Sequence, residues 1–223
     1  MTVPIFSGGY AFSILQNCTI RKTLTPEEYQ SLVRRVQLNH PVSAGDASRV
    51  LARCVSLPVA DRIEVIKERF KKELISPSPI GSIRDTYLSP RVYVLNPFLL
   101  AFSYIGKPGI PYLMQEKNKT VENEEIKKWW ILALGFAEDD SVAEDLKRII
   151  QNDTDKSMQC IAIRAYARSA RQAAIPLLEK LQEGYTPGKE PPSLQGHMKY
   201  LVEITAKEEL FELQEQNVQD GKK

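Results

Sequence analysis

Apolar residues recur at the three- and four-residue spacing of amphipathic helices over most of the chain. The first such segment opens at Thr25-Pro26-Glu27-Glu28, where threonine can cap a helix, proline fits its first position and glutamate completes a capping box. Its apolar stripe is formed by Tyr29, Leu32, Val33 and Val36. The same spacing predicts two further helices, from Ala44 to Ser56 and from Pro58 to Leu74. In the last of them we expect four charged residues to face water, namely Lys67, Glu68, Lys71 and Lys72.

The helical pattern stops between residues 75 and 91. Prolines, a glycine and serines dominate this stretch, and such residues favour loops. Long loops inside compact domains are uncommon and often functional, so we interpret it as a linker or binding loop, or alternatively as an insertion between repeats. It separates an N-terminal extension (1–24) and helical region (25–74) from a second helical region (92–206) and a charged C-terminal tail (207–223).

An internal repeat begins after Asn96-Pro97, which is again a capping residue followed by proline. An alanine followed by a large apolar residue and then a small residue occurs at Ala101, and recurs after 32 and another 32 residues at Ala133 and Ala165. A second series with nearly the same period consists of Leu113, Leu146 and Leu178. A period of this length made of two helices is typical of a solenoid.

Stacking explains why such a repeat folds, because one helical hairpin cannot bury its own apolar face and a stack of hairpins can. The small residues of the repeat would let paired helices approach closely; they are Ser103, Gly135 and Ala167. Tight turns between hairpins are expected at Gly106-Lys107-Pro108, Asp139-Asp140 and Arg171-Gln172. The sequence therefore predicts an all-α protein with the architecture of an α-α superhelix.

Two segments resemble HEAT repeats of the short bacterial kind. They are Ala165 to Leu178, with Ile175-Pro176-Leu177-Leu178 opening a helix, and Lys107-Pro108-Gly109-Ile110-Pro111-Tyr112-Leu113. The resemblance extends over residues 97–183, and in the middle unit Glu144 replaces the proline of its neighbours. It implies a HEAT-like solenoid with a tendency to bind proteins, and it implies no particular partner.

Composition and charge narrow the functional classes. The 223 residues include 30 basic and 28 acidic ones, and a net charge of +2 is low for a dedicated nucleic-acid binder. No segment is long and apolar enough to span a bilayer, and the start of the chain is a poor signal peptide, which favours a cytoplasmic protein. The three cysteines lack metal-site spacing and are interpreted as reduced core thiols: Cys18, Cys54 and Cys160.

No catalytic motif withstands inspection. The chain has only two histidines, His40 and His197, and it lacks the common hydrolase, metalloprotease and phosphate-loop motifs. We therefore predict no catalytic residue, no metal site and no cofactor.

The candidate binding residues are Lys127, Lys128, Trp130, Arg164 and Arg168. Arg164, Arg168 and Arg171 share one helical face, which could bind phosphate or carboxylate groups, or could pair with acids of the neighbouring hairpin such as Asp139 or Asp140. Trp129 and Trp130 point about 100° apart on a helix, so one could be exposed as a contact point; the alternative is that both pack between hairpins.

These features favour a non-catalytic interaction module or scaffold that binds a protein partner on its inner helices. The alternative is a DNA-binding protein related to HEAT-like alkylpurine DNA glycosylases, since Lys128-Trp129-Trp130 resembles one of their segments. The acid expected after the tryptophans is absent, because Ile131, Leu132 and Ala133 stand there, and nucleic acid is the less favoured partner. A bilin lyase-like HEAT protein is a third reading by analogy of fold alone. The sequence does not indicate the partner's identity or the oligomeric state.

Overall fold

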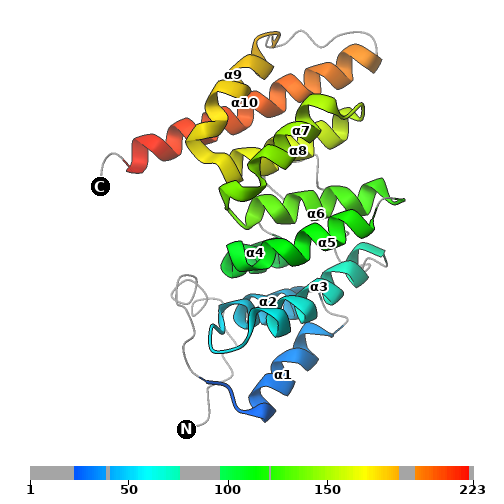
Figure 1. The fold of residues 1–223 in the computed structure, drawn as a ribbon, viewed down its shortest axis with the longest axis vertical. Helices are drawn as coiled ribbons and strands as arrows, with labels where there is room; N and C mark the ends of the chain where they lie inside the picture. The colour runs from blue at the N-terminus through cyan, green and yellow to red at the C-terminus, as the bar shows by residue number, and fades with distance from the viewer. Residues whose placement is uncertain (1–22, 39–40, 76–95, 121, 186–193, 221–223) are drawn as a thin grey trace.

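The computed structural model describes residues 23–38, 41–75, 96–120, 122–185 and 194–220 (Figure 1). These residues form α-helices and short 3₁₀ turns, and no strand occurs among them. The helices are α1 (Pro26–Val36), α2 (Pro41–Arg53), α3 (Val59–Ile75), α4 (Pro97–Ile105), α5 (Ile110–Lys119), α6 (Glu124–Phe136), α7 (Ala143–Asn152), α8 (Lys156–Ala170), α9 (Ile175–Gln182) and α10 (Leu194–Asp220). The 3₁₀ turns are η3 (Lys107–Gly109), η4 (Asp140–Val142) and η5 (Arg171–Ala174).

Two of the predicted helix starts are confirmed by their caps. The Thr25 hydroxyl accepts a hydrogen bond from the Glu28 backbone N–H at 3.2 Å, and the Glu28 carboxylate accepts one from the Thr25 N–H at 3.0 Å. This reciprocal pair is a capping box. The Asn96 side chain likewise accepts hydrogen bonds from the N–H groups of Phe98 and Leu99 at the start of α4. Both caps satisfy donors that the first turn of a helix leaves unpaired.

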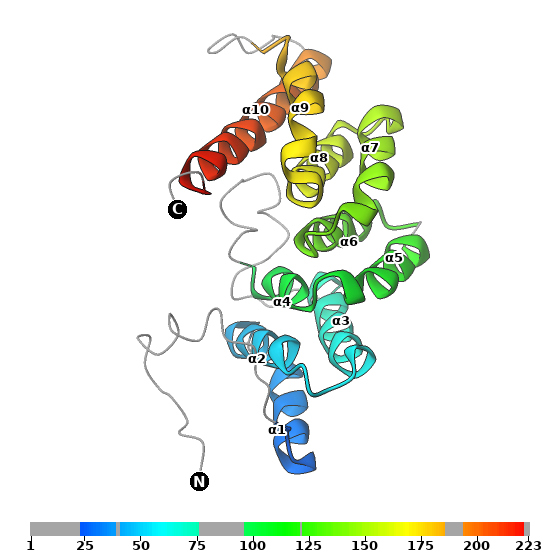
Figure 2. The same cartoon turned by 60° about the vertical axis from the view of Figure 1, so that its left-hand side comes forward.

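The helices pair in chain order and the pairs stack. Helices α1 and α2, α3 and α4, α5 and α6, α7 and α8, and α9 and α10 pack as hairpins. The second helices of the pairs (α2, α4, α6, α8 and α10) also pack one on the next along the stack. Figure 2 shows α3, α5 and α7 along one side of these second helices. The predicted all-α architecture of stacked helical hairpins is confirmed.

Close contact between second helices depends on small residues. A Cβ atom on Gly135 of α6 would fall 2.8 Å from the Cβ of Ala165 on α8, and nearer still to the Ala165 Cα. Gly45 of α2 makes a similar approach to the ring of Pro97 at the start of α4. Gly135 therefore lets two helices approach closely, but these are the second helices of successive hairpins and not the paired helices of the prediction.

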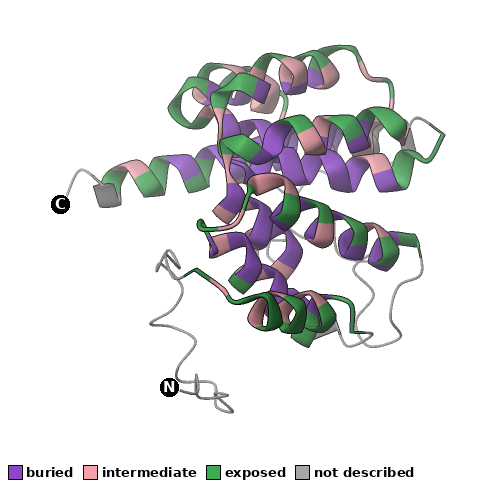
Figure 3. Ribbon diagram, turned by 60° about the horizontal axis from the view of Figure 1, so that its bottom comes forward, coloured by how far each residue is buried: buried purple, intermediate pink, exposed green. Residues whose placement is uncertain are grey.

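Aromatic side chains fill the centre of the stack. The ring of Phe70 on α3 lies 5.2 Å from that of Trp130 and 6.2 Å from that of Trp129, both in edge-to-face geometry. Phe98 and Phe102 of α4 complete the cluster. All five side chains are buried, and Figure 3 shows buried residues on several turns of the stacked helices. Edge-to-face packing adds to the burial of apolar surface that stabilises the hairpins against one another.

Helix α3 corrects one expectation about its charged face. Lys67 was expected to face water, yet its side chain is 3% exposed. Its Nζ atom lies 2.8 Å from Glu64 and 3.3 Å from Glu116, which belongs to α5. The stripe on α3 correctly identified the apolar face, but it could not show that the next hairpin covers the flank of the helix with a matching acid.

The C-terminal part of the chain forms a single long helix. The predicted boundary at residue 207 lies inside α10, which continues to Asp220. Leu210 and Leu213, beyond that boundary, are buried, because α10 packs against α8 and α9. The extension at 1–24 and the loop at 75–91 lie almost entirely outside the described residues. No described helix combines the length and the apolar composition needed to cross a bilayer.

Candidate functional site

Backbone positions with positive φ mark the junctions between successive hairpins. Gly106, Glu138 and Arg171 follow the ends of α4, α6 and α8, with φ of 65°, 53° and 49°. They are spaced by 32 and 33 residues, so they occupy equivalent positions in the repeat. Glycine adopts this conformation readily, whereas a residue with a side chain pays about 1 kcal/mol or more. The chain therefore keeps two strained residues, at the junctions after α6 and α8, where the junction after α4 has a glycine.

The side chains of the two residues with strained backbone, Glu138 and Arg171, bind each other across neighbouring junctions. The Arg171 Nη2 atom donates a hydrogen bond to the Glu138 carboxylate at 2.8 Å. The next residue, Gln172, donates from Nε2 to the Asn217 side-chain oxygen on α10 at 3.0 Å. These two contacts connect the ends of α6, α8 and α10, which belong to three successive hairpins.

The preceding pair of junctions is connected in the same way. The Lys107 Nζ atom lies 3.2 Å from the Asp139 carboxylate. Asp139 also accepts a hydrogen bond from the Ser141 N–H and so caps the turn η4. The hydrogen bonds from Ser141 lower the pKa of Asp139, and Lys107 lowers it further. Two ion pairs, Lys107–Asp139 and Arg171–Glu138, thus connect the junctions after α4, α6 and α8 in series.

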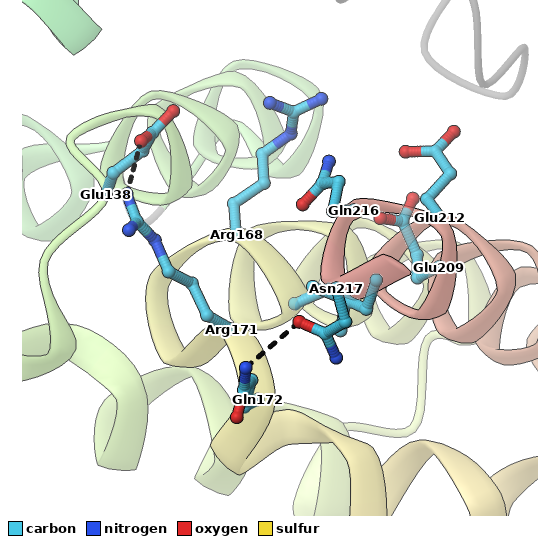
Figure 4. Close-up of a pocket in the computed structure, with 10 residues that line it drawn as sticks. Glu138, Arg168, Arg171, Gln172, Glu209, Glu212, Gln216 and Asn217 are labelled. Carbon is cyan, nitrogen blue, oxygen red and sulfur yellow. Dashed lines mark hydrogen bonds and ion pairs between the residues drawn. The ribbon is translucent and has the colours of Figure 1, made fainter. Parts of the chain in front are cut away.

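A cleft of about 430 Å³ opens beside these contacts, and we call it the junction cleft. It lies between the end of α6, the C-terminal half of α8 and the C-terminal half of α10 (Figure 4). Its lining is charged or amide-bearing at most positions and consists of Glu138, Ala167, Arg168, Arg171, Gln172, Glu209, Glu212, Leu213, Gln216 and Asn217. Carboxamides both donate and accept hydrogen bonds, so this lining can satisfy the polar groups of a bound chain.

Arg168 is the predicted binding residue that the structure places in the junction cleft. Its guanidinium carbon lies 4.3 Å from the centroid of the Phe136 ring, which is a cation–π contact. Figure 4 shows the side chain extending between Glu138 on one side and Gln216 and Glu212 on the other. The aromatic ring contacts the flat face of the guanidinium, whose edges carry only N–H groups that donate hydrogen bonds.

Arg164, one turn earlier on α8, is buried and engaged by α10. Its Nη2 atom lies 3.5 Å from Glu208 and its Nε atom 3.9 Å from Glu209. Burial raises the pKa of Glu208; Arg164 opposes this shift and the neighbouring charge of Glu212 adds to it. The expectation that Arg164 is an accessible contact residue is therefore corrected, because the last helix of the stack covers it.

The two lysines of α6 differ in their surroundings. Lys128 is buried, and its Nζ atom lies 2.8 Å from Glu125 and 3.1 Å from Asp155, the N-cap residue of α8. Burial alone would lower the pKa of Lys128, but the hydrogen bonds to these carboxylates outweigh it and raise the pKa. Lys127 is half-buried and lies 3.4 Å from Glu124. Lys128 joins two hairpins, so its role as a surface contact is corrected.

Trp130 lies in the centre of the stack. It is 0% exposed, and Trp129 is 2% exposed. The expectation that Trp130 contacts a partner is corrected, and the interpretation that both tryptophans pack between hairpins is confirmed. The physical reason is that α6 lies between α4 and α8 and packs against α5, so aromatic side chains around it meet other helices.

The cysteines and acids offer no metal site among the described residues. Cys54 and Cys160 are buried and unlinked, as expected for core thiols, and Cys18 lies outside the described part of the chain. Burial raises the pKa of the Cys160 thiol, which keeps it protonated.

Several cleft residues were not predicted from the sequence. Glu138 could have been found, because the repeat places it in register with Gly106, the position where a tight turn requires positive φ. Glu212, Gln216 and Asn217 could not, because they lie where the sequence suggested a separate tail.

Comparisons with family models, with curated proteins and with solved structures find no match to this chain. The resemblance to HEAT repeats therefore stays a prediction.

Proposed function

We propose that this chain is a protein-interaction module that binds a segment of a partner protein in the junction cleft. The observation that carries the proposal is the strained backbone at Glu138 and Arg171, at positions equivalent to Gly106. Strain of this kind concentrates at functional sites, and both side chains line the cleft. A HEAT-like solenoid, as the sequence resemblance implies, would present such a cleft between stacked hairpins.

The chemistry of the cleft matches a polypeptide in extended conformation. Gln216 and Asn217 offer amide donors and acceptors, which complement the N–H and C=O groups of a peptide backbone. Arg168 and Glu212 place opposite charges on the same cleft, so side chains of either sign on the partner can be accommodated. A binding site of mixed charge favours a specific sequence over a uniformly charged polymer.

The same features disfavour a nucleic acid. Glu138, Glu209 and Glu212 line the cleft and repel phosphate groups. The buried Trp129 and Trp130 offer no platform on which bases could stack. The glycosylase reading would need a carboxylate in a basic, aromatic-lined groove, whereas the lining of this cleft holds three carboxylates beside two arginines and no aromatic side chain.

The test is site-specific photocrosslinking from the cleft. Gln216 is replaced by benzoylphenylalanine, and the control carries the same group at Arg148, an exposed residue of α7. We expect a protein adduct from Gln216 alone, and we expect Arg168→Glu to abolish it while Arg148→Glu leaves it intact. Arg164 is unsuitable for this purpose, because a glutamate there would be buried against Glu208 and Glu209 and would destabilise the fold.

The outcome is judged from the crosslinked peptide. A single partner segment mapped by mass spectrometry supports the proposal. Equal labelling from Gln216 and Arg148, or an adduct that survives Arg168→Glu, contradicts it. Recovery of nucleic acid that is lost at high salt would favour the alternative function.

A further inference from the structure

A line of apolar residues runs along the outward face of α10. Phe211 and Val218 are 59% and 56% exposed, and Ile204 is half-buried. The three are spaced by seven residues, which is nearly two helical turns, so they lie on one line along the helix. Other exposed large apolar residues, such as Leu38 and Val55, lie elsewhere on the stack.

This face is the one on which the stack ends. Ala206, Leu210 and Leu213 form the opposite side of α10 and are buried where the helix packs against α8 and α9. Helices α4, α6 and α8 each pack between two other second helices, whereas α10 ends the described stack (Figure 1). Terminal units of solenoids normally present a polar outer face, so exposed apolar residues here indicate a binding surface.

Charge along the apolar line is unequal on its two edges. One edge carries three acids, Glu208, Glu212 and Glu215. Burial raises the pKa of Glu208, and the nearby charge of Glu212 raises it further against the opposing effect of Arg164. The other edge carries Lys207, whose Nζ atom lies 4.4 Å from the centroid of the Tyr185 ring. The acidic edge therefore lacks a basic counterpart on the helix itself.

The position of the acids distinguishes two possible partners of this face, which are a second copy of α10 and a basic helix of another protein. If a second copy of α10 paired antiparallel with this face, equivalent edges would meet and the acids of the two copies would repel. In a parallel pair each acidic edge would meet an edge with one lysine, Lys207, which already contacts Tyr185. A helix that carries lysines or arginines along one side satisfies the acids and covers the apolar line.

We propose that the outward face of α10 binds a basic amphipathic helix of another protein. The apolar side of that helix covers Ile204, Phe211 and Val218, and its basic side lies along Glu208, Glu212 and Glu215. The partner helix takes the place of a further second helix in the stack. This surface shares Glu212 with the junction cleft, but its apolar line lies outside the lining of that cleft, so the proposal does not require that a segment bind there.

The test uses two synthetic peptides of about 20 residues, long enough to span the apolar line. Both carry leucine at heptad positions; one carries lysines on the flanking positions and the other glutamates. Fluorescence anisotropy of each labelled peptide is measured against the full chain. We expect saturable binding of the lysine peptide and none of the glutamate peptide. Phe211→Ser should weaken binding by about tenfold or more, since a large apolar contact is lost.

Two further variants separate the effect of charge from the effect of apolar contact. Glu215→Lys should weaken binding of the lysine peptide and strengthen that of the glutamate peptide. Val55→Ser removes a comparably exposed apolar residue at a distant place, and it should leave binding unchanged. Circular dichroism verifies that each variant is folded.

Three results would overturn the proposal. The first is absence of binding by the lysine peptide. The second is equal binding of both peptides, or binding unaffected by Phe211→Ser, because either shows general hydrophobic adhesion. The third is a dimer of the full chain in sedimentation equilibrium that Phe211→Ser dissociates, because a second copy would then cover the face.

Discussion

Gly135 of α6 lies against Ala165 of α8 so closely that a Cβ atom on the glycine would fall 2.8 Å from the alanine Cβ and 2.9 Å from its carbonyl oxygen. Real Cβ atoms do not approach backbone atoms to this distance, so the two helices would have to separate. The hairpins ending in α6 and α8 therefore depend on the absence of one methyl group for their packing.

Gly135→Ala tests this dependence. We expect the free energy of unfolding to fall by about 1–3 kcal/mol, because overpacking forces the helices apart at a backbone contact. Guanidinium denaturation followed by circular dichroism measures it. Gly184→Ala is the control, since the atoms nearest to its added methyl group belong to the carboxylate end of the Glu203 side chain and not to a backbone. An unchanged midpoint for Gly135→Ala would show that the helices have room to spare.

At position 138, glycine should give a more stable protein than alanine, which reverses their usual order of stability in helices. In a helix interior glycine is less stable than alanine, but at a φ of 53° alanine keeps the backbone strain and glycine relieves it. Both changes remove the pair with Arg171 equally. We expect Glu138→Gly to exceed Glu138→Ala in unfolding free energy by about 1 kcal/mol, measured by urea denaturation. The opposite order would mean that the junction does not impose positive φ in solution.

Lys128 and Lys127 form a matched pair for testing structural against surface roles. Lys128→Met leaves the carboxylates of Glu125 and Asp155 without their cation, and we expect a loss of about 1–3 kcal/mol in unfolding free energy. Lys127→Met removes a more exposed pair and should cost less than about 0.5 kcal/mol. Thermal unfolding of the two variants measures both losses in unfolding free energy. Equal losses would contradict the assignment of Lys128 to the core of the stack.

The burial of both tryptophans predicts the wavelength of their fluorescence emission and its sensitivity to quenching. Because Trp129 and Trp130 are buried and the chain has no other tryptophan, native fluorescence should be blue-shifted and weakly quenched by acrylamide. Unfolding in guanidinium should shift the emission to the red and expose both rings to the quencher. Strong quenching of the native protein would contradict the burial of the tryptophans and would favour the prediction that Trp130 is an exposed contact residue.

Glu116 should make stability depend on acid pH. Burial alone would raise its pKa, but Lys119 and Lys67 outweigh burial and lower it. The folded state therefore releases the proton more readily than the unfolded chain. The stabilisation is complete above the ordinary glutamate pKa of about 4.3 and is lost as pH falls through the lower folded pKa. Glu116→Gln should flatten the decline in unfolding free energy below about pH 4.5, while the exposed Glu179→Gln should not.

The sequence was sufficient to predict the class of fold and several of its details. The repeat at Ala101, Ala133 and Ala165 falls on α4, α6 and α8, which pack successively in the stack. Periodicity and caps work here because they are local properties, and a local pattern repeated at a constant interval implies that equivalent surfaces meet.

The candidate site was less predictable, because it depends on which helices cover which faces. Arg164 and Arg168 are one turn apart and look alike in the sequence, yet α10 covers the first and leaves the second in the cleft. The charged composition after Lys207 suggested a tail, whereas Leu210 and Leu213 anchor that segment to the stack. Burial of a charged residue is decided by a partner far away in the chain, and no local pattern reports it.

The junction cleft takes its walls from three hairpins, so its width depends on the twist between them. Solenoids deform by small changes of that twist, which makes the cleft responsive to the elasticity of the whole stack. A ligand that bridges α6 and α10 would stiffen this end of the molecule. Thermodynamic coupling is reciprocal, so a force that untwists the stack would weaken ligand binding by the same free energy by which the bound ligand opposes untwisting. Tension along the molecule and occupancy of the cleft would therefore act on one equilibrium.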